Sequence, residues 1–136
     1  MDFKTGDILR VNSLVPFVSH YAIVFSMDGK QYAAHNSFTK GQVLIIPLEE
    51  FLTKKEFLSH IRNCRTESLT DQEIINKINE IRTRKYSFWS WNCEDFTDYV
   101  CPDCTVKTDQ RIVWGFGLFF VLLLIILSFK YIKTNN

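Results

Sequence analysis

The chain has 136 residues, of which 46% are hydrophobic, and its formal net charge is +1. This length fits a single domain, and so small a charge gives no reason to expect nucleic acid as a partner.

The amino-terminal half reads as a series of strands separated by turn residues. Asp28-Gly29 is typical of a two-residue hairpin turn. Residues 48–58 alternate charged and bulky side chains and predict one or two helical turns. The expected strands cover residues 7–11, 20–25, 31–35, 42–47 and 59–63.

The carboxy-terminal half adds helices to these strands. Thr70 and Glu73 have the spacing of a capping box, and isoleucines then recur on one helical face. This helix is expected to fade by Arg84, and a shorter one to begin near Asn92. Because the strands come first and the helices late, the sequence predicts an α+β domain with an antiparallel sheet.

An uncharged apolar run occupies residues 112–129, where 14 of 18 residues are Leu, Ile, Val or Phe. As a helix it is about 27 Å long, close to the roughly 30 Å hydrocarbon core of a bilayer. We therefore expect a single-pass C-terminal tail anchor with the domain facing the cytosol, since no signal peptide pattern is present. The expected division is 1–107 for the catalytic domain, 108–111 for a juxtamembrane linker, 112–129 for the anchor and 130–136 for a polar tail.

The four cysteines are Cys64, Cys93, Cys101 and Cys104. In a reducing cytosol they are expected to be thiols. Cys101 and Cys104 have the spacing of half a zinc site or of a redox pair, but no second such pair accompanies them. Neither a metal nor a cofactor is therefore expected; palmitoylation near the anchor and a plain linker role both stay open.

One cysteine has a setting that favours chemistry. Asn92 is a good helix N-cap, which places Cys93 in a first turn. Free backbone N–H groups there stabilise a thiolate and can hold an oxyanion. If the hairpin forms, His20 and His35 lie near the same end of the sheet, so that one can act as base and the other can orient it. The alternatives are a buried structural Cys93 and structural histidines, and His60, which has no partner signal, is assigned a structural role.

These residues belong to a larger set that occurs in a familiar order. The set comprises Gly6-Asp7-Ile8-Leu9, His20-Tyr21-Ala22-Ile23, Asp28-Gly29, Ala34-His35, Lys85-Tyr86-Ser87, Asn92-Cys93-Glu94-Asp95-Phe96 and Thr108-Asp109-Gln110. With it the sequence resembles the family of lecithin:retinol acyltransferase and the H-Ras-like suppressor phospholipase/acyltransferases, which are circularly permuted relatives of the papain-like NlpC/P60 enzymes. Asp95 stands where the family usually has histidine, and the spacing from His20 to His35 is a few residues longer than in the family.

The resemblance implies a permuted NlpC/P60 papain-like α+β fold, with helices packed on an antiparallel sheet and one transmembrane helix added. It implies Cys93 as nucleophile, His20 as general base and His35 as the third polar member. The implied activity is a membrane-anchored cysteine phospholipase A/acyltransferase that cleaves phospholipid acyl esters through a thioester, with water, an alcohol or an amine as acceptor. The alternatives are a permuted papain-like isopeptidase or amidase, and a non-enzymatic membrane adaptor.

Overall fold

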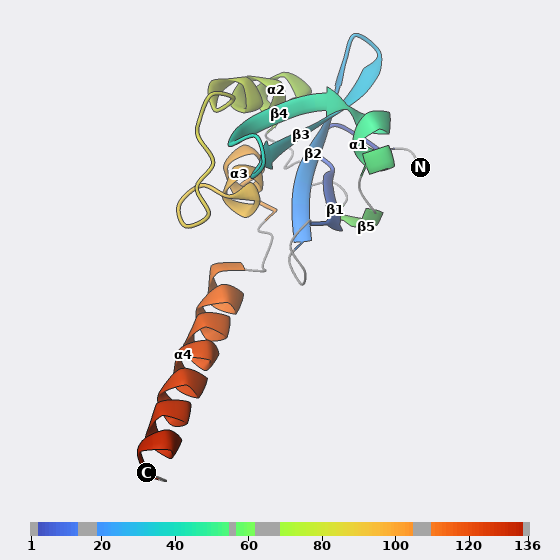
Figure 1. The fold of residues 1–136 in the computed structure, drawn as a ribbon. Helices are drawn as coiled ribbons and strands as arrows, with labels where there is room; N and C mark the ends of the chain where they lie inside the picture. Colours follow the sequence, from blue (N-terminus) through green and yellow to red (C-terminus); the bar gives the residue numbers. More distant parts are fainter. Residues whose placement is uncertain (1–2, 14–18, 55–56, 62–68, 105–109, 135–136) are drawn as a thin grey trace.

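A five-stranded antiparallel sheet forms the centre of the domain in the computed structural model, which describes residues 3–13, 19–54, 57–61, 69–104 and 110–134 (Figure 1). The strands are β1 (Ile8–Asn12), β2 (Ser19–Met27), β3 (Lys30–Ser37), β4 (Gln42–Pro47) and β5 (Phe57–Ile61). Their order in the sheet is β4-β3-β2-β1-β5. The first four strands therefore form a meander, and β5 returns to pair with β1.

The turn between β2 and β3 sets the register of the central hairpin. Asp28 and Gly29 both have positive φ, at 52° and 72°. Positive φ at both central residues is the requirement of a type I′ turn, whose twist matches that of the flanking strands. Met27 consequently pairs with Lys30, and the ladder runs back to Ile23 and Ala34. The predicted hairpin is confirmed.

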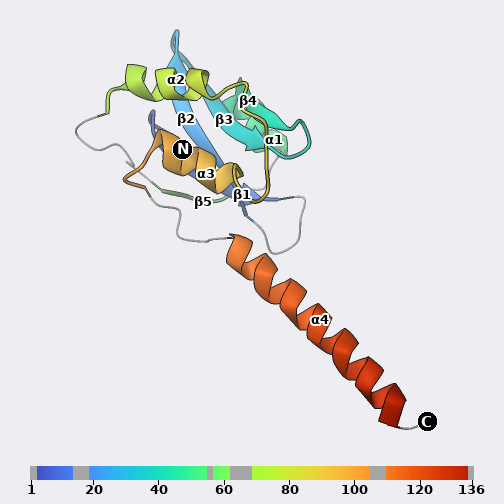
Figure 2. The same ribbon diagram turned by 90° about the vertical axis from the view of Figure 1, so that its left-hand side faces the viewer.

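Strand β2 is covered on both faces, as its run of five buried residues from Tyr21 to Phe25 requires. Successive side chains of a strand point to opposite faces. Tyr21, Ile23 and Phe25 accordingly join one apolar cluster, whereas Ala22 and Val24 join a second. Helices α2 and α3 lie on the first face and α1 on the second (Figure 2).

The three helices of the domain are α1 (Leu48–Lys54), α2 (Asp71–Glu80) and α3 (Cys93–Val100). The capping box predicted at Thr70 is confirmed, because its side chain accepts the N–H of Glu73 while the Glu73 carboxylate accepts the N–H of Thr70. The apolar face of α2 then packs against the sheet through Ile74 and Ile78. Lys77 of this helix donates to the last carbonyls of α3, at 3.4 Å, and ties the two helices together.

The prediction of a transmembrane anchor is wrong. The transmembrane helix in the expected fold class and the expected tail-anchored membrane location depended on this anchor, so both are wrong as well. Helix α4 (Gln110–Thr134) follows the domain, with exposed apolar side chains from Leu118 to Leu127. Among the described residues, however, no helix combines the length and the apolarity needed to cross a membrane. The shown architecture is thus α+β with an antiparallel sheet.

The cysteines also differ from expectation. Cys93 and Cys101 are free and buried, but Cys104 is disulfide-bonded to a partner outside the described residues. The expectation that every cysteine is a thiol is therefore wrong for Cys104. The spacing of cysteines along a chain does not reveal which sulfurs the fold brings together, so this bond could not be predicted from the sequence.

Candidate functional site

Cys93 is the first residue of α3, and a capping box fixes its position. The side-chain oxygen of Asn92 accepts the N–H groups of Glu94, at 2.8 Å, and of Asp95, at 3.2 Å. The Asp95 carboxylate in turn accepts the Asn92 N–H at 2.9 Å. These bonds satisfy donors that a helix start otherwise leaves open. The N-cap predicted at Asn92 is confirmed.

The Cys93 thiol is enclosed, with only 3% of the residue exposed. Burial raises its pKa to about 12, since the charged thiolate loses its hydration. Hydrogen bonds from the backbone of Tyr21, Cys93 and Glu94 act in the opposite direction and lower the pKa, whereas the nearby Glu94 carboxylate raises it. The sulfur is therefore protonated in this closed arrangement, although backbone donors already surround it.

The two candidate histidines contact each other. His20 Nε2 and His35 Nδ1 lie 2.9 Å apart, and the rings meet edge to face with centroids 5.0 Å apart. One nitrogen must donate and the other accept, so the contact requires that at least one ring be neutral. The His35 ring also lies 5.2 Å from that of Phe51 in α1. His20 and His35 therefore lie close together, as expected, and they lie on the face of the sheet that α1 covers.

Tyr21 connects the thiol with the histidine pair. The ladder between β2 and β3 ends at Ile23 and Ala34, and Tyr21 lies beyond this point, where its backbone bonds to the Cys93 sulfur. His20 is the neighbour of Tyr21 in β2. Cys93 packs with the α2 and α3 cluster, whereas His35 contacts Phe51 on the other face. The structure therefore brings the histidines together and ties Cys93 to the same strand end; the catalytic roles of the three residues stay a prediction.

No family model matches the sequence, and no curated protein matches it. The resemblance to the lecithin:retinol acyltransferase family rests on the ordered residues alone. The Thr108-Asp109 part of that set lies outside the described residues, as does the side chain of His60.

Two polar residues near the thiol received no role from the sequence. The pKa of Tyr86 is raised to about 12, first by burial and then by the charges of Cys93, Asp95 and Glu94. Asn36 is fully buried, and its amide donates to the carbonyls of Trp91 and Asn92 at 2.8 and 3.2 Å. Tyr86 belongs to the resembling set, but for Asn36 the only available signal was its place next to His35.

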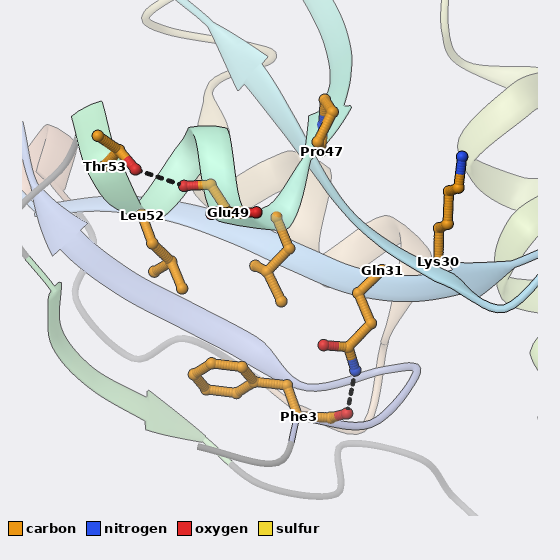
Figure 3. A pocket seen from close by; sticks show the side chains of 8 residues that line it. Phe3, Lys30, Gln31, Pro47, Glu49, Leu52 and Thr53 are labelled. Atoms are coloured by element: carbon orange, nitrogen blue, oxygen red, sulfur yellow. Dashed lines mark hydrogen bonds between the residues drawn. The ribbon is translucent and has the colours of Figure 1, made fainter.

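A groove in the described part of the structure lies elsewhere, between Phe3 and α1 (Figure 3). Its volume is about 750 Å³, and its lining includes Phe3, Gln31, Leu48 and Leu52. None of the three candidate catalytic residues lines it. Because Cys93 is only 3% exposed, access to its thiol requires movement of the residues that cover it.

A metal site finds no support in the ranges that the structure describes, where no three His, Cys, Asp or Glu side chains gather. The Cys101-Pro102-Asp103-Cys104 segment is a turn, in which the N–H of Cys104 donates to the Cys101 carbonyl at 3.0 Å. Burial raises the pKa of the Cys101 thiol to about 11, in the same direction as that of Cys93.

Proposed function

We propose that this protein is a cysteine hydrolase or acyltransferase that cleaves acyl esters, phospholipids among them, through a thioester on Cys93. The observation that carries the proposal is the surroundings of the sulfur: Cys93 begins a capped helix, and three backbone groups hydrogen-bond to its thiol. Such donors stabilise a thiolate and, once the thiolate has reacted, the oxyanion of a tetrahedral intermediate.

The proposed reaction uses the histidines as base and support. His20 removes the thiol proton, and the sulfur attacks the ester carbonyl carbon, whose oxygen takes up the negative charge. Collapse of this intermediate expels the alcohol part of the ester, which receives the proton from His20, and leaves an acyl thioester on Cys93. Water, an alcohol or an amine then attacks the thioester with His20 again as base, and the free thiol returns.

His35 holds the base in place through the 2.9 Å contact between the rings. A ring nitrogen of His20 engaged by His35 cannot also serve the thiol, so the other nitrogen must take the thiol proton. His20 lies at the second residue of β2, beyond the ladder with β3 but still paired with Val11 of β1, so its release requires this pair to open. A local shift of this strand end is the movement that would bring the ring to the sulfur and admit the substrate.

A second candidate is a non-enzymatic binding domain in which Cys93 is structural. The observation that favours it is the enclosure of the thiol, which is 3% exposed and has a pKa raised to about 12. In such a domain the helix start would serve packing alone. The two functions differ in whether the thiol ever becomes reactive.

The test is hydrolysis of a short-chain p-nitrophenyl ester by the full chain. Turnover is expected in the native protein, and Cys93→Ala should reduce it to the uncatalysed background. His20→Gln should reduce it by about a hundredfold or more, the usual contribution of a general base. Cys101→Ala is the matched control, because among the described cysteines Cys101 is also free and buried, and it follows the same helix. Absence of turnover in the native protein, or equal losses at Cys93 and Cys101, would favour the binding domain.

A further inference from the structure

Asn36 is a buried polar residue that holds the start of α3 against the sheet. It lies in β3 with none of its surface exposed. Its side-chain amide donates to two successive carbonyls, that of Trp91 at 2.8 Å and that of Asn92 at 3.2 Å.

These two bonds fix the orientation of two peptide groups. A trans peptide is planar, and its carbonyl and its N–H point in opposite directions. The Trp91 carbonyl shares a plane with the Asn92 N–H, which donates to Asp95. The Asn92 carbonyl shares a plane with the Cys93 N–H, which bonds to the sulfur of the same residue. Asn36 therefore holds the Asn92 carbonyl on one side of this peptide group, and the Cys93 N–H on the opposite side faces the thiol.

The helix itself does not need these bonds. The Asn92 carbonyl also accepts the Phe96 N–H at 3.1 Å, and the Trp91 carbonyl accepts the Ser87 N–H at 3.0 Å. Loss of the Asn36 amide would therefore leave neither carbonyl without a partner. The side-chain oxygen of Asn36, in contrast, is buried and has no hydrogen-bond partner among the described residues. A buried acceptor without a partner costs about 1–3 kcal/mol, so an apolar side chain of similar size would suit stability better.

We propose that Asn36 is a positioning residue that directs the backbone N–H of Cys93 at the reacting sulfur and at the oxyanion formed there. This inference rests on the proposed function for its importance in turnover, but the orientation of the thiol can be tested without turnover. A residue kept only for stability would be replaced by leucine without a change in the chemistry of Cys93. Replacement of a positioning residue by leucine would change the chemistry of Cys93.

The experiment compares Asn36→Leu with the native full chain in two measurements, the unfolding midpoint and the alkylation rate of Cys93 by iodoacetamide between about pH 7 and pH 10. We expect the midpoint to be kept or raised. We expect the alkylation profile to move to higher pH by about one unit, a tenfold lower rate at a given pH, because the thiolate loses a directed donor. Ser37→Ala, at the next and also buried residue of β3, is the control and should leave the profile unchanged.

An unchanged profile in folded Asn36→Leu would overturn the proposal, and so would an equal shift in Ser37→Ala. If Asn36→Leu does not fold, Asn36→Ser carries the test, because serine keeps one donor and is shorter. Its profile should then lie at higher pH than that of the native protein, and a native profile would again overturn the proposal. Ester turnover is measured in the same samples. A shifted alkylation profile in a protein without turnover would contradict the proposed enzymatic function but support the positioning role of Asn36.

Discussion

The burial of the Cys93 thiol predicts a specific loss of stability at alkaline pH. The pKa of Cys93 is raised from 9.0 to about 12 in the folded protein, mainly because the thiolate would be buried. Below pH 9 the thiol is protonated in both folded and unfolded chains, so its contribution is complete. Above pH 9 the unfolded chain releases the proton while the folded protein keeps it, and stability therefore falls as pH rises toward 12.

The size of this effect follows from the two pKa values. One pH unit corresponds to about 1.4 kcal/mol for each proton released, so the contribution of Cys93 should fall by about 2 kcal/mol between pH 7 and about pH 10.5. Cys93→Ala cannot release this proton, and its stability curve should be flatter by the same amount. The packing that the substitution removes shifts the whole curve and leaves its slope unaltered.

The assay is urea unfolding of both proteins at several pH values, followed by circular dichroism. Tyr99 and Cys101 also have raised pKa values, but they are present in both proteins and cancel in the comparison. The raised pKa of Tyr86 depends in part on the charge of Cys93, so both proteins carry Tyr86→Phe in this comparison. Parallel curves from pH 7 to about pH 10.5 would refute the reasoning, because they would mean that the folded thiol titrates as it does in the unfolded chain.

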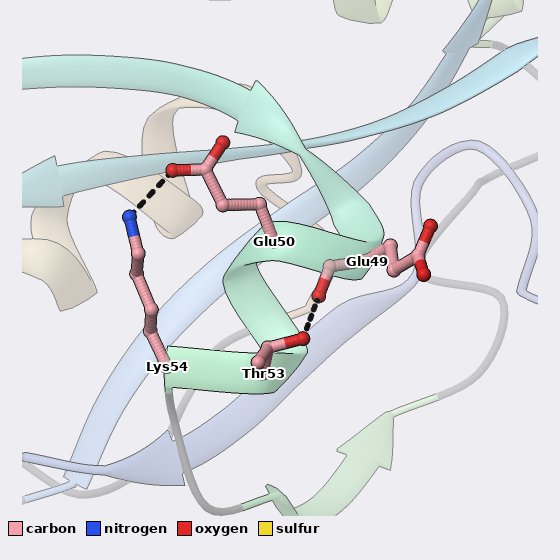
Figure 4. A network of polar contacts seen from close by, with 4 residues as sticks. All are labelled: Glu49, Glu50, Thr53 and Lys54. Atoms are coloured by element: carbon pink, nitrogen blue, oxygen red, sulfur yellow. Dashed lines mark hydrogen bonds and ion pairs between the residues drawn. The ribbon is translucent and has the colours of Figure 1, made fainter.

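Three further substitutions or treatments have expected outcomes. Asn92→Ala should cost about 1 kcal/mol or slightly more in the free energy of unfolding, because the N-cap side chain serves two N–H groups; a urea midpoint equal to that of the native protein would contradict the cap. Lys54→Ala should change that free energy by less than about 0.5 kcal/mol, since its ion pair with Glu50 is an exposed i,i+4 pair (Figure 4); a loss above about 1 kcal/mol would show that the pair matters more than its exposure indicates. Reduction with dithiothreitol should lower the midpoint by an amount equivalent to about 2–4 kcal/mol, because the Cys104 disulfide restricts the unfolded chain, and equal midpoints with and without reductant would contradict it.

Local patterns predicted the elements of the domain well, for reasons that lie in single turns of the chain. Asp28-Gly29 determines the hairpin because few residues tolerate positive φ at both central positions. Thr70 and Asn92 determine helix starts because their short polar side chains reach N–H groups three residues or fewer ahead. Such signals act over a few residues, and the sequence displays them directly.

The features that the sequence did not reveal depend on contacts between distant segments. Asn36 meets Trp91 and Asn92 across 55 and 56 residues, and no local pattern announces this pairing. The enclosure of Cys93 has the same origin, because it depends on how α3 packs against β2. The helix-start position predicted a reactive thiol, whereas burial raises its pKa. The membrane span was predicted for a different reason, from the apolar composition and length of residues 112–129. No described helix provides such a span.

The measurement that tests the central claim most directly is the mass of the Cys93 peptide after the full chain is mixed with phosphatidylcholine in detergent and quenched in acid. The account predicts an added fatty acyl group on the Cys93 peptide, released by hydroxylamine as a thioester should be, and absent from Cys93→Ala. It also predicts a weaker signal in His20→Gln, because the base that generates the thiolate is missing. An unmodified Cys93 peptide, or an acyl group found equally on Cys101, would contradict the assignment of Cys93 as the nucleophile.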